Sequence, residues 1–212
     1  MSPLSFSPFS PFVPLTLLRK YPDDSTLHST PPHGGYEKLL SFQKARIVYD
    51  GTVWFCKHYL DKRDRTYDQM VQAARSGKQN ILEGSQASGT SKATEIKLTN
   101  VGRASLEELL EDYRDYLRTR HIEEWTKEHP YTHRLRQLNR QPNASYETFK
   151  KGIEHSDPAI AANVMIGLIK LTTHLLDRQL RQLEKAFVEE GGLRERMTRA
   201  RLTERGKLKR GH

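Results

Sequence analysis

A group of polar side chains between residues 69 and 83 is the part of the sequence best suited to bind a charged partner. Arg75, Gln79 and Glu83 are spaced by four, so on a helix they lie on one face. The amide and hydroxyl residues beside that face are Gln72, Ser76 and Asn80. Such a group hydrogen-bonds helices or subunits together, or it forms part of a surface that binds phosphates. The sequence favours the two interpretations equally.

Basic residues near this group supply the charge that a phosphate-binding surface needs. The candidates on the same and the following predicted helix are Arg75, Lys78, Lys92, Lys97 and Arg103. Further candidates near the C-terminus are Arg194, Arg196, Arg199 and Arg201. Between residues 194 and 210, eight lysines and arginines stand against two glutamates, so this segment holds +6 of the chain's formal net charge of +9. Basic charge of this kind attracts polyanions such as nucleic acid.

The sequence does not indicate a metal or cofactor site. A di-iron bundle needs a histidine three residues after a glutamate, and no glutamate here has one. His129 and His133 are separated by Pro130 and lack an obvious third ligand, so they are interpreted as a solvated pair. Residues 84–92 contain glycines and a lysine, but a phosphate loop needs the lysine directly after the second glycine and a strand before the first. We therefore expect a turn between helices there, no cofactor and no metal.

Residues arranged for acid–base or nucleophilic catalysis are not found either. Five carboxylates share one face of the third predicted helix, which is typical of a solvated or salt-bridged surface. They are Glu107, Glu108, Glu111, Asp112 and Asp115. The single cysteine, Cys56, excludes an internal disulfide, fits a reducing compartment and is expected to be a small buried hydrophobic residue. Without a nucleophile–base pair, we expect that the protein is not an enzyme.

Helices must position all of these residues. Apolar residues recur with helical spacing over residues 36–60, 67–83, 92–120 and 157–192, and no strand-like alternation competes with that pattern. We expect the turn after the second helix to span residues 84–91.

Residues at the predicted helix ends, and one glycine inside a helix, support this assignment. Ser91 and Asp157 are suitable N-caps, Pro158 suits a first helical position, and a glycine at 191 can end the last helix. Gly77 lies on an apolar stripe at a cost in helix propensity, which predicts close approach of a neighbouring helix.

The fold class expected from these elements is all-α: an antiparallel four-helix bundle with a long third connection and a basic C-terminal extension. The chain divides into a disordered Ser/Pro-rich leader (1–34), the first three helices (35–120), an irregular connection with short helices (121–156), the fourth helix (157–192) and a basic tail (193–212).

No window of eighteen uninterrupted apolar residues is present, so we expect no membrane span and a cytoplasmic protein.

The central part of the chain resembles a known family. Residues Met70 to Leu117 are similar to the bacterial four-helix-bundle family that includes the 23S ribosomal RNA intervening-sequence protein and the accessory variability determinant of diversity-generating retroelements. The residues that carry the resemblance are Gln72, Arg75, Ser76, Asn80, Ile81, Glu83, Gly84, Ser91, Glu95, Arg103, Ala104, Ser105, Leu106 and Glu108. The first helix and the segment from Leu175 look like the branch with a C-terminal suffix domain. The resemblance covers Gly35 to Arg201.

The resemblance implies a nonenzymatic homopentamer of bundles, whose basic surface in the retroelement members binds nucleic acid and a reverse transcriptase. We therefore expect an oligomeric helical protein that binds RNA or DNA through basic surfaces, with a reverse transcriptase as a further partner. Residues 121–157 separate the third and fourth helices by more than the compact members need. The alternative is a protein-interaction scaffold whose basic tail docks on an acidic partner.

Overall fold

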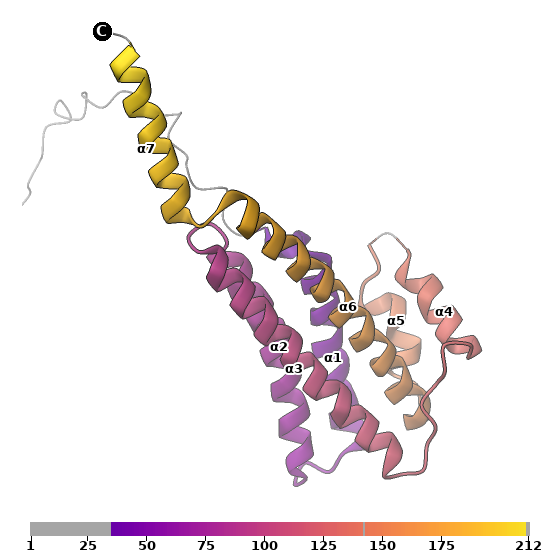
Figure 1. The fold of residues 1–212 in the computed structure, drawn as a ribbon. Helices are drawn as coiled ribbons and strands as arrows, with labels where there is room; N and C mark the ends of the chain where they lie inside the picture. The colour runs from indigo at the N-terminus through magenta and orange to yellow at the C-terminus, as the bar shows by residue number, and fades with distance from the viewer. Residues whose placement is uncertain (1–34, 142, 211–212) are drawn as a thin grey trace, which may run out of the picture. The chain divides into compact units, whose positions relative to one another are not determined.

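The computed structural model describes residues 35–141 and 143–210, and within these ranges the chain forms helices and no strand (Figure 1). This confirms the all-α class for the described part. The elements in chain order are η2 (Tyr36–Lys38), α1 (Leu40–Tyr59), α2 (Arg65–Ala87), α3 (Lys92–Arg118), α4 (Pro130–Asn139), α5 (Tyr146–Ile153), α6 (Pro158–Glu190) and α7 (Leu193–Arg210). The predicted leader lies outside the described residues.

Side-chain caps determine where several helices begin. The Asp64 carboxylate accepts a hydrogen bond from Thr66 N at the start of α2 (2.9 Å). The predicted caps are confirmed: Ser91 Oγ accepts from Thr94 N (3.2 Å), and Asp157 accepts from Ala159 N (2.8 Å) with a proline at the first position. Helix α6 ends at Gly191, whose φ of +75° lies in the left-handed region that glycine adopts without strain.

The predicted end of the second helix is wrong, because α2 continues through residues 84–87 and the chain turns only after them. Gly84 is buried, and a Cβ atom there would lie 3.2 Å from the Thr99 hydroxyl and 3.3 Å from the Glu95 carbonyl oxygen. Glycine at this position therefore allows α2 to pack closely on α3 and does not terminate the helix. The first predicted helix is also divided, since Leu39 has an extended ψ of 120° between η2 and α1.

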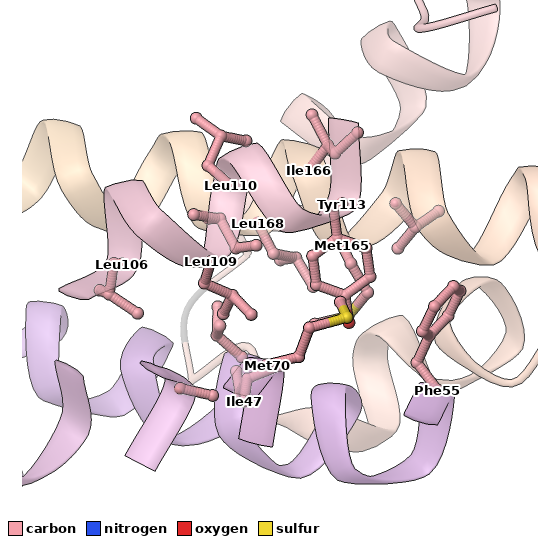
Figure 2. Close-up of a cluster of buried hydrophobic side chains, with 14 of the residues drawn as sticks. Ile47, Phe55, Met70, Leu106, Leu109, Leu110, Tyr113, Met165, Ile166 and Leu168 are labelled. Atoms are coloured by element: carbon pink, nitrogen blue, oxygen red, sulfur yellow. The ribbon is translucent and has the colours of Figure 1, made fainter. Parts of the chain in front are cut away.

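Four long helices surround a shared hydrophobic core. Helix α2 packs against α3, α3 against α6, and α1 against both α2 and α6. Figure 2 shows apolar side chains of these helices converging in the interior. They include Ile47, Phe55, Met70, Leu106, Leu109, Tyr113, Met165 and Leu168. Cys56 is fully buried beside them, as predicted, and burial raises the pKa of its thiol to about 12.

Two glycines allow the close contact between α2 and α3. A Cβ atom on Gly77 would lie 2.6 Å from Leu106 Cδ2, and one on Gly102 would lie 3.0 Å from the Gly77 carbonyl oxygen. Real Cβ atoms essentially never approach other atoms to 2.6 Å. The close helix approach predicted from Gly77 is therefore confirmed, and it needs a second glycine on the partner helix.

The connection between α3 and α6 is held onto α6 by a buried amide. Asn163 Oδ1 accepts a hydrogen bond from Trp125 N (2.8 Å), and its Nδ2 donates to the Glu123 carbonyl oxygen (3.1 Å). The Glu124 carboxylate pairs with Arg114 of α3 (3.1 Å) and with Lys170 of α6. These contacts order a segment that lacks apolar periodicity in the sequence.

Helix α6 is apolar enough to raise the question of a membrane span. By length and composition alone, its residues Pro158–Glu189 could cross a bilayer. The core helix of a globular protein meets the same criteria, and more than half of the most apolar stretch is buried inside the structure. Its apolar residues Met165, Leu168 and Ile169 are part of the common core, which accounts for the composition.

Candidate nucleic-acid interface

Two of the basic candidates on α2 and α3, Lys78 and Arg103, face different neighbouring helices. Lys78 lies over the ring of Tyr49, with Nζ 4.2 Å from the ring centroid, so it faces α1. Arg103 instead faces α6, where its Nε lies 3.6 Å from an Asp177 carboxylate oxygen. Lys78 is therefore directed toward α1 and Arg103 toward α6.

Several of these cations are already paired with carboxylates. Lys92 Nζ lies 2.8 Å from the carboxylate of Glu95, which is buried, and Arg103 donates to Glu107 at 2.5 Å. Arg75 and Lys97 are exposed, and neither has a carboxylate within 4.0 Å among the described residues. Because Lys92 and Arg103 are paired and Lys78 lies over Tyr49, Arg75 and Lys97 are the candidates on α2 and α3 that are most open to a phosphate.

One member of the polar group on α2, Ser76, joins α2 to α3. Ser76 Oγ and Ser105 Oγ are 2.9 Å apart, and Asn80 Nδ2 donates to the Ser76 carbonyl oxygen at 2.9 Å. Gln72, Glu83 and Glu108, which also carry the family resemblance, are exposed. Of the two interpretations of this group, hydrogen bonding between helices has direct geometric support within one chain.

The basic tail forms α7, an 18-residue helix from Leu193 to Arg210. Arg199, Arg201 and Arg205 are exposed on it. Arg194 and Arg196 lie in the same helix, and their side chains are outside the described part of the chain. The apolar residues Met197 and Leu202 are also exposed, at 44% and 62%. Because α7 is rich in cations and poor in acids, it is the strongest basic feature of the described chain.

The acidic face of α3 is solvated and salt-bridged as predicted, with one exception. Glu111 pairs with Arg114 at 2.6 Å, and Asp115 pairs with Arg118 at 2.8 Å. Asp112 is half-buried, and this burial, together with the neighbouring charges of Glu108 and Asp115, raises the pKa of its carboxyl to about 6.

Asp112→Asn is expected to stabilise the protein above pH 6 and not below pH 4. The unfolded pKa is about 3.9, so the folded state binds its proton more tightly. The protonated Asp112 carboxyl therefore contributes to the free energy of unfolding. That contribution is fully present below the pKa of the unfolded state and is lost as the pH rises through the pKa of the folded state. After allowance for solvent screening, we expect a gain of about 1 kcal/mol at pH 7.5.

Urea unfolding of both proteins at pH 4 and pH 7.5 checks this prediction. The pH 4 comparison is the control, because there the folded wild-type carboxyl is also uncharged. An equal difference between the two proteins at both pH values would show that Asp112 is not destabilised by its charge.

The described residues contain no group of three or more His, Cys, Asp and Glu side chains that could hold a metal ion. His129 Nδ1 instead accepts a hydrogen bond from Tyr131 N (3.3 Å), while its ring stacks on Trp125.

No family model matches the chain, and no curated protein or solved structure is significantly similar to it.

Proposed function

We propose that this chain is a nonenzymatic four-helix-bundle protein that binds nucleic acid mainly through α7. The mutual packing of α1, α2, α3 and α6 around one core supports the bundle. In this proposal α4 and α5 belong to the long third connection. The bundle provides the rigid part and α7 provides the charge.

The observation that carries the proposal is the concentration of cations on α7. Among the described residues, no carboxylate lies within 4.0 Å of the exposed Arg199, Arg201 or Arg205, whereas Lys92 and Arg103 of α3 are paired. An 18-residue helix is about 27 Å long. That length reaches several consecutive phosphates of a nucleic-acid strand, each of which an arginine can contact.

Charge reversal on α7 tests the proposal. Arg199→Glu combined with Arg201→Glu is expected to weaken binding of a fluorescently labelled single-stranded RNA at least about tenfold in an anisotropy titration, because phosphate contacts dominate such binding. The matched control is Arg178→Glu combined with Arg181→Glu, which makes the same change of charge at two exposed positions of α6.

The affinity of the control variant for RNA should fall less than about threefold, because its substitutions change only the long-range electrostatic field of the protein. Light scattering on the same samples must show an unchanged oligomer, and the family resemblance leads us to expect five copies. No measurable RNA or DNA binding by the wild type, or equal losses in both variants, would contradict the proposal. If light scattering shows a monomer, only the expected pentamer is contradicted, and the proposed nucleic-acid binding is not.

The proposal has two further parts, a protein partner and a location in the cell. A reverse transcriptase is the protein partner we propose, because the retroelement members of the family bind one. We also propose a cytoplasmic location, to which a single buried cysteine is suited.

A second candidate function is docking of α7 on an acidic protein. The exposed apolar residues Val188, Met197 and Leu202 near the cations favour it, because protein interfaces combine apolar contacts with charge. Co-purification of one acidic protein after nuclease treatment, without RNA or DNA binding, would replace the first proposal with this one.

A further inference from the structure

A second candidate site lies near the N-terminal end of α6, where α4, α5 and α6 meet. A cavity of about 350 Å³ is present there. Its floor is apolar and includes Leu135, Phe149 and Val164. Cavities of this size and composition bind small organic molecules when a few polar groups fix the orientation.

Aromatic rings form part of the cavity wall. Trp125 and Tyr131 both line it, and their ring centroids are 5.1 Å apart. His129 stacks on Trp125 with an interplanar angle of 6°, which supports the indole. Tyr131 is 54% exposed, so part of its ring is open to a ligand. Planar aromatic ligands stack on such rings.

The charged groups around the cavity are all basic. Arg134, Lys151 and His155 line it, and none of the other lining residues is an aspartate or glutamate. His155 Nδ1 accepts a hydrogen bond from Asp157 N (3.0 Å), so in the neutral ring the proton is on Nε2 and remains a donor. The site therefore offers donors and positive charge beside an apolar, aromatic wall.

A larger cavity lies beside α1, and its lining does not favour an anionic ligand in the same way. It measures about 550 Å³ and is lined by the carboxylates of Asp50 and Glu147 as well as by Arg46. Mixed charge gives no preference for an anion. Unlike this cavity and three others on the surface, which contain an aspartate or glutamate, the cavity of α4, α5 and α6 combines aromatic walls with cations alone.

We propose that the cavity bounded by Trp125, Tyr131, Arg134, Lys151 and His155 binds a nucleotide, with its base against the aromatic wall and its phosphate on the basic side chains. The chemistry is shared by a free mononucleotide and by an unstacked nucleotide of a single strand. The site is independent of α7, because it lies at the N-terminal end of α6 and α7 follows the C-terminal end.

Calorimetry of the full chain with adenosine 5′-monophosphate tests the proposal. Arg134→Ala is expected to weaken binding at least about fivefold, since it removes a charge-assisted contact to the phosphate. The matched control is Arg136→Ala, an exposed arginine of α4 that does not line the cavity, and it should leave binding unchanged. Tyr131→Leu should also weaken binding, because it removes a stacking surface. Inorganic phosphate alone should compete poorly.

A second arm distinguishes the two sources of the nucleotide. If the free nucleotide does not bind but Arg134→Ala weakens binding of a single-stranded adenosine decanucleotide and Arg136→Ala does not, the occupant is a nucleotide within a strand. Equal effects of the two arginine variants in both arms, or phosphate competing as well as the nucleotide, would overturn the site. The variant with glutamate at positions 199 and 201 should bind the free nucleotide as the wild type does, because it leaves the cavity intact. The α7 proposal can therefore fail without affecting this test of the cavity.

Discussion

Replacing Phe55 with alanine is expected to lower the free energy of unfolding by about 3–5 kcal/mol, the usual cost of removing a buried aromatic side chain. Phe55 is fully buried, and its ring centroid lies 4.9 Å from that of Tyr113 and 4.9 Å from that of Tyr116. The substitution removes apolar contact area from α1 and also these edge-to-face and tilted aromatic contacts with α3.

Urea unfolding followed by circular dichroism measures the loss. Leu40→Ala is the matched control on the same helix, because Leu40 is 51% exposed. It should change the free energy of unfolding by about 0.5 kcal/mol or less. Similar values for the two variants would mean that the aromatic cluster is not part of the folded core.

Gly102→Val is expected to destabilise the protein by about 2–3 kcal/mol, because the core of two closely packed helices would be overfilled. A Cβ atom at Gly102 would lie 3.0 Å from the Gly77 carbonyl oxygen and 3.2 Å from Ile81 Cγ1, and the first of these atoms is backbone that cannot rotate away. The helix propensity that valine gains over glycine offsets only a small part of this cost.

The same substitution at Gly206 provides the control. Gly206 lies in α7, and nothing lies within 4 Å of a Cβ atom built there. Gly206→Val should therefore leave the melting temperature nearly unchanged, whereas Gly102→Val should lower it clearly. A melting temperature unchanged by Gly102→Val would rule out the close contact between α2 and α3.

The helices and most of their caps could be predicted because their signals are local. Ser91, Asp157 and Pro158 act within one turn of the residues they cap, so the sequence around them is sufficient. Gly84 shows the limit of that reasoning. Its role depends on the neighbouring Thr99 and Glu95 of another helix, and a glycine that permits close packing looks the same in sequence as one that ends a helix.

The polar contacts that join separate helices and loops could not be predicted, because the partners are distant in sequence. Arg103 meets Asp177 of α6, and Asn163 holds the backbone of residues 123 and 125. Lys44 is a further example: it is 2% exposed, its Nζ has no hydrogen-bond partner among the described residues, and burial lowers its pKa. Its amine lies over the ring of Phe149, a contact that no periodicity in the sequence indicates.

The cavity of α4, α5 and α6 cannot be predicted from the sequence, for a similar reason. Its residues come from the connection that lacks apolar periodicity, and their aromatic and basic types were scattered between residues 125 and 155. The one available signal was the pair of aromatic residues Trp125 and Tyr131 flanking His129.

The salt dependence of RNA binding is the most direct test of the claim that α7 binds phosphates. Binding of a single strand should weaken steeply between 50 and 200 mM salt, with a slope of log K against log salt of about −0.7 for each phosphate contacted. The variant with glutamate in place of Arg199 and Arg201 should have a slope less steep by at least about 1.4, since two contacts are lost. The same slope in the variant and the wild type, or affinity that does not change with salt, would contradict the claim.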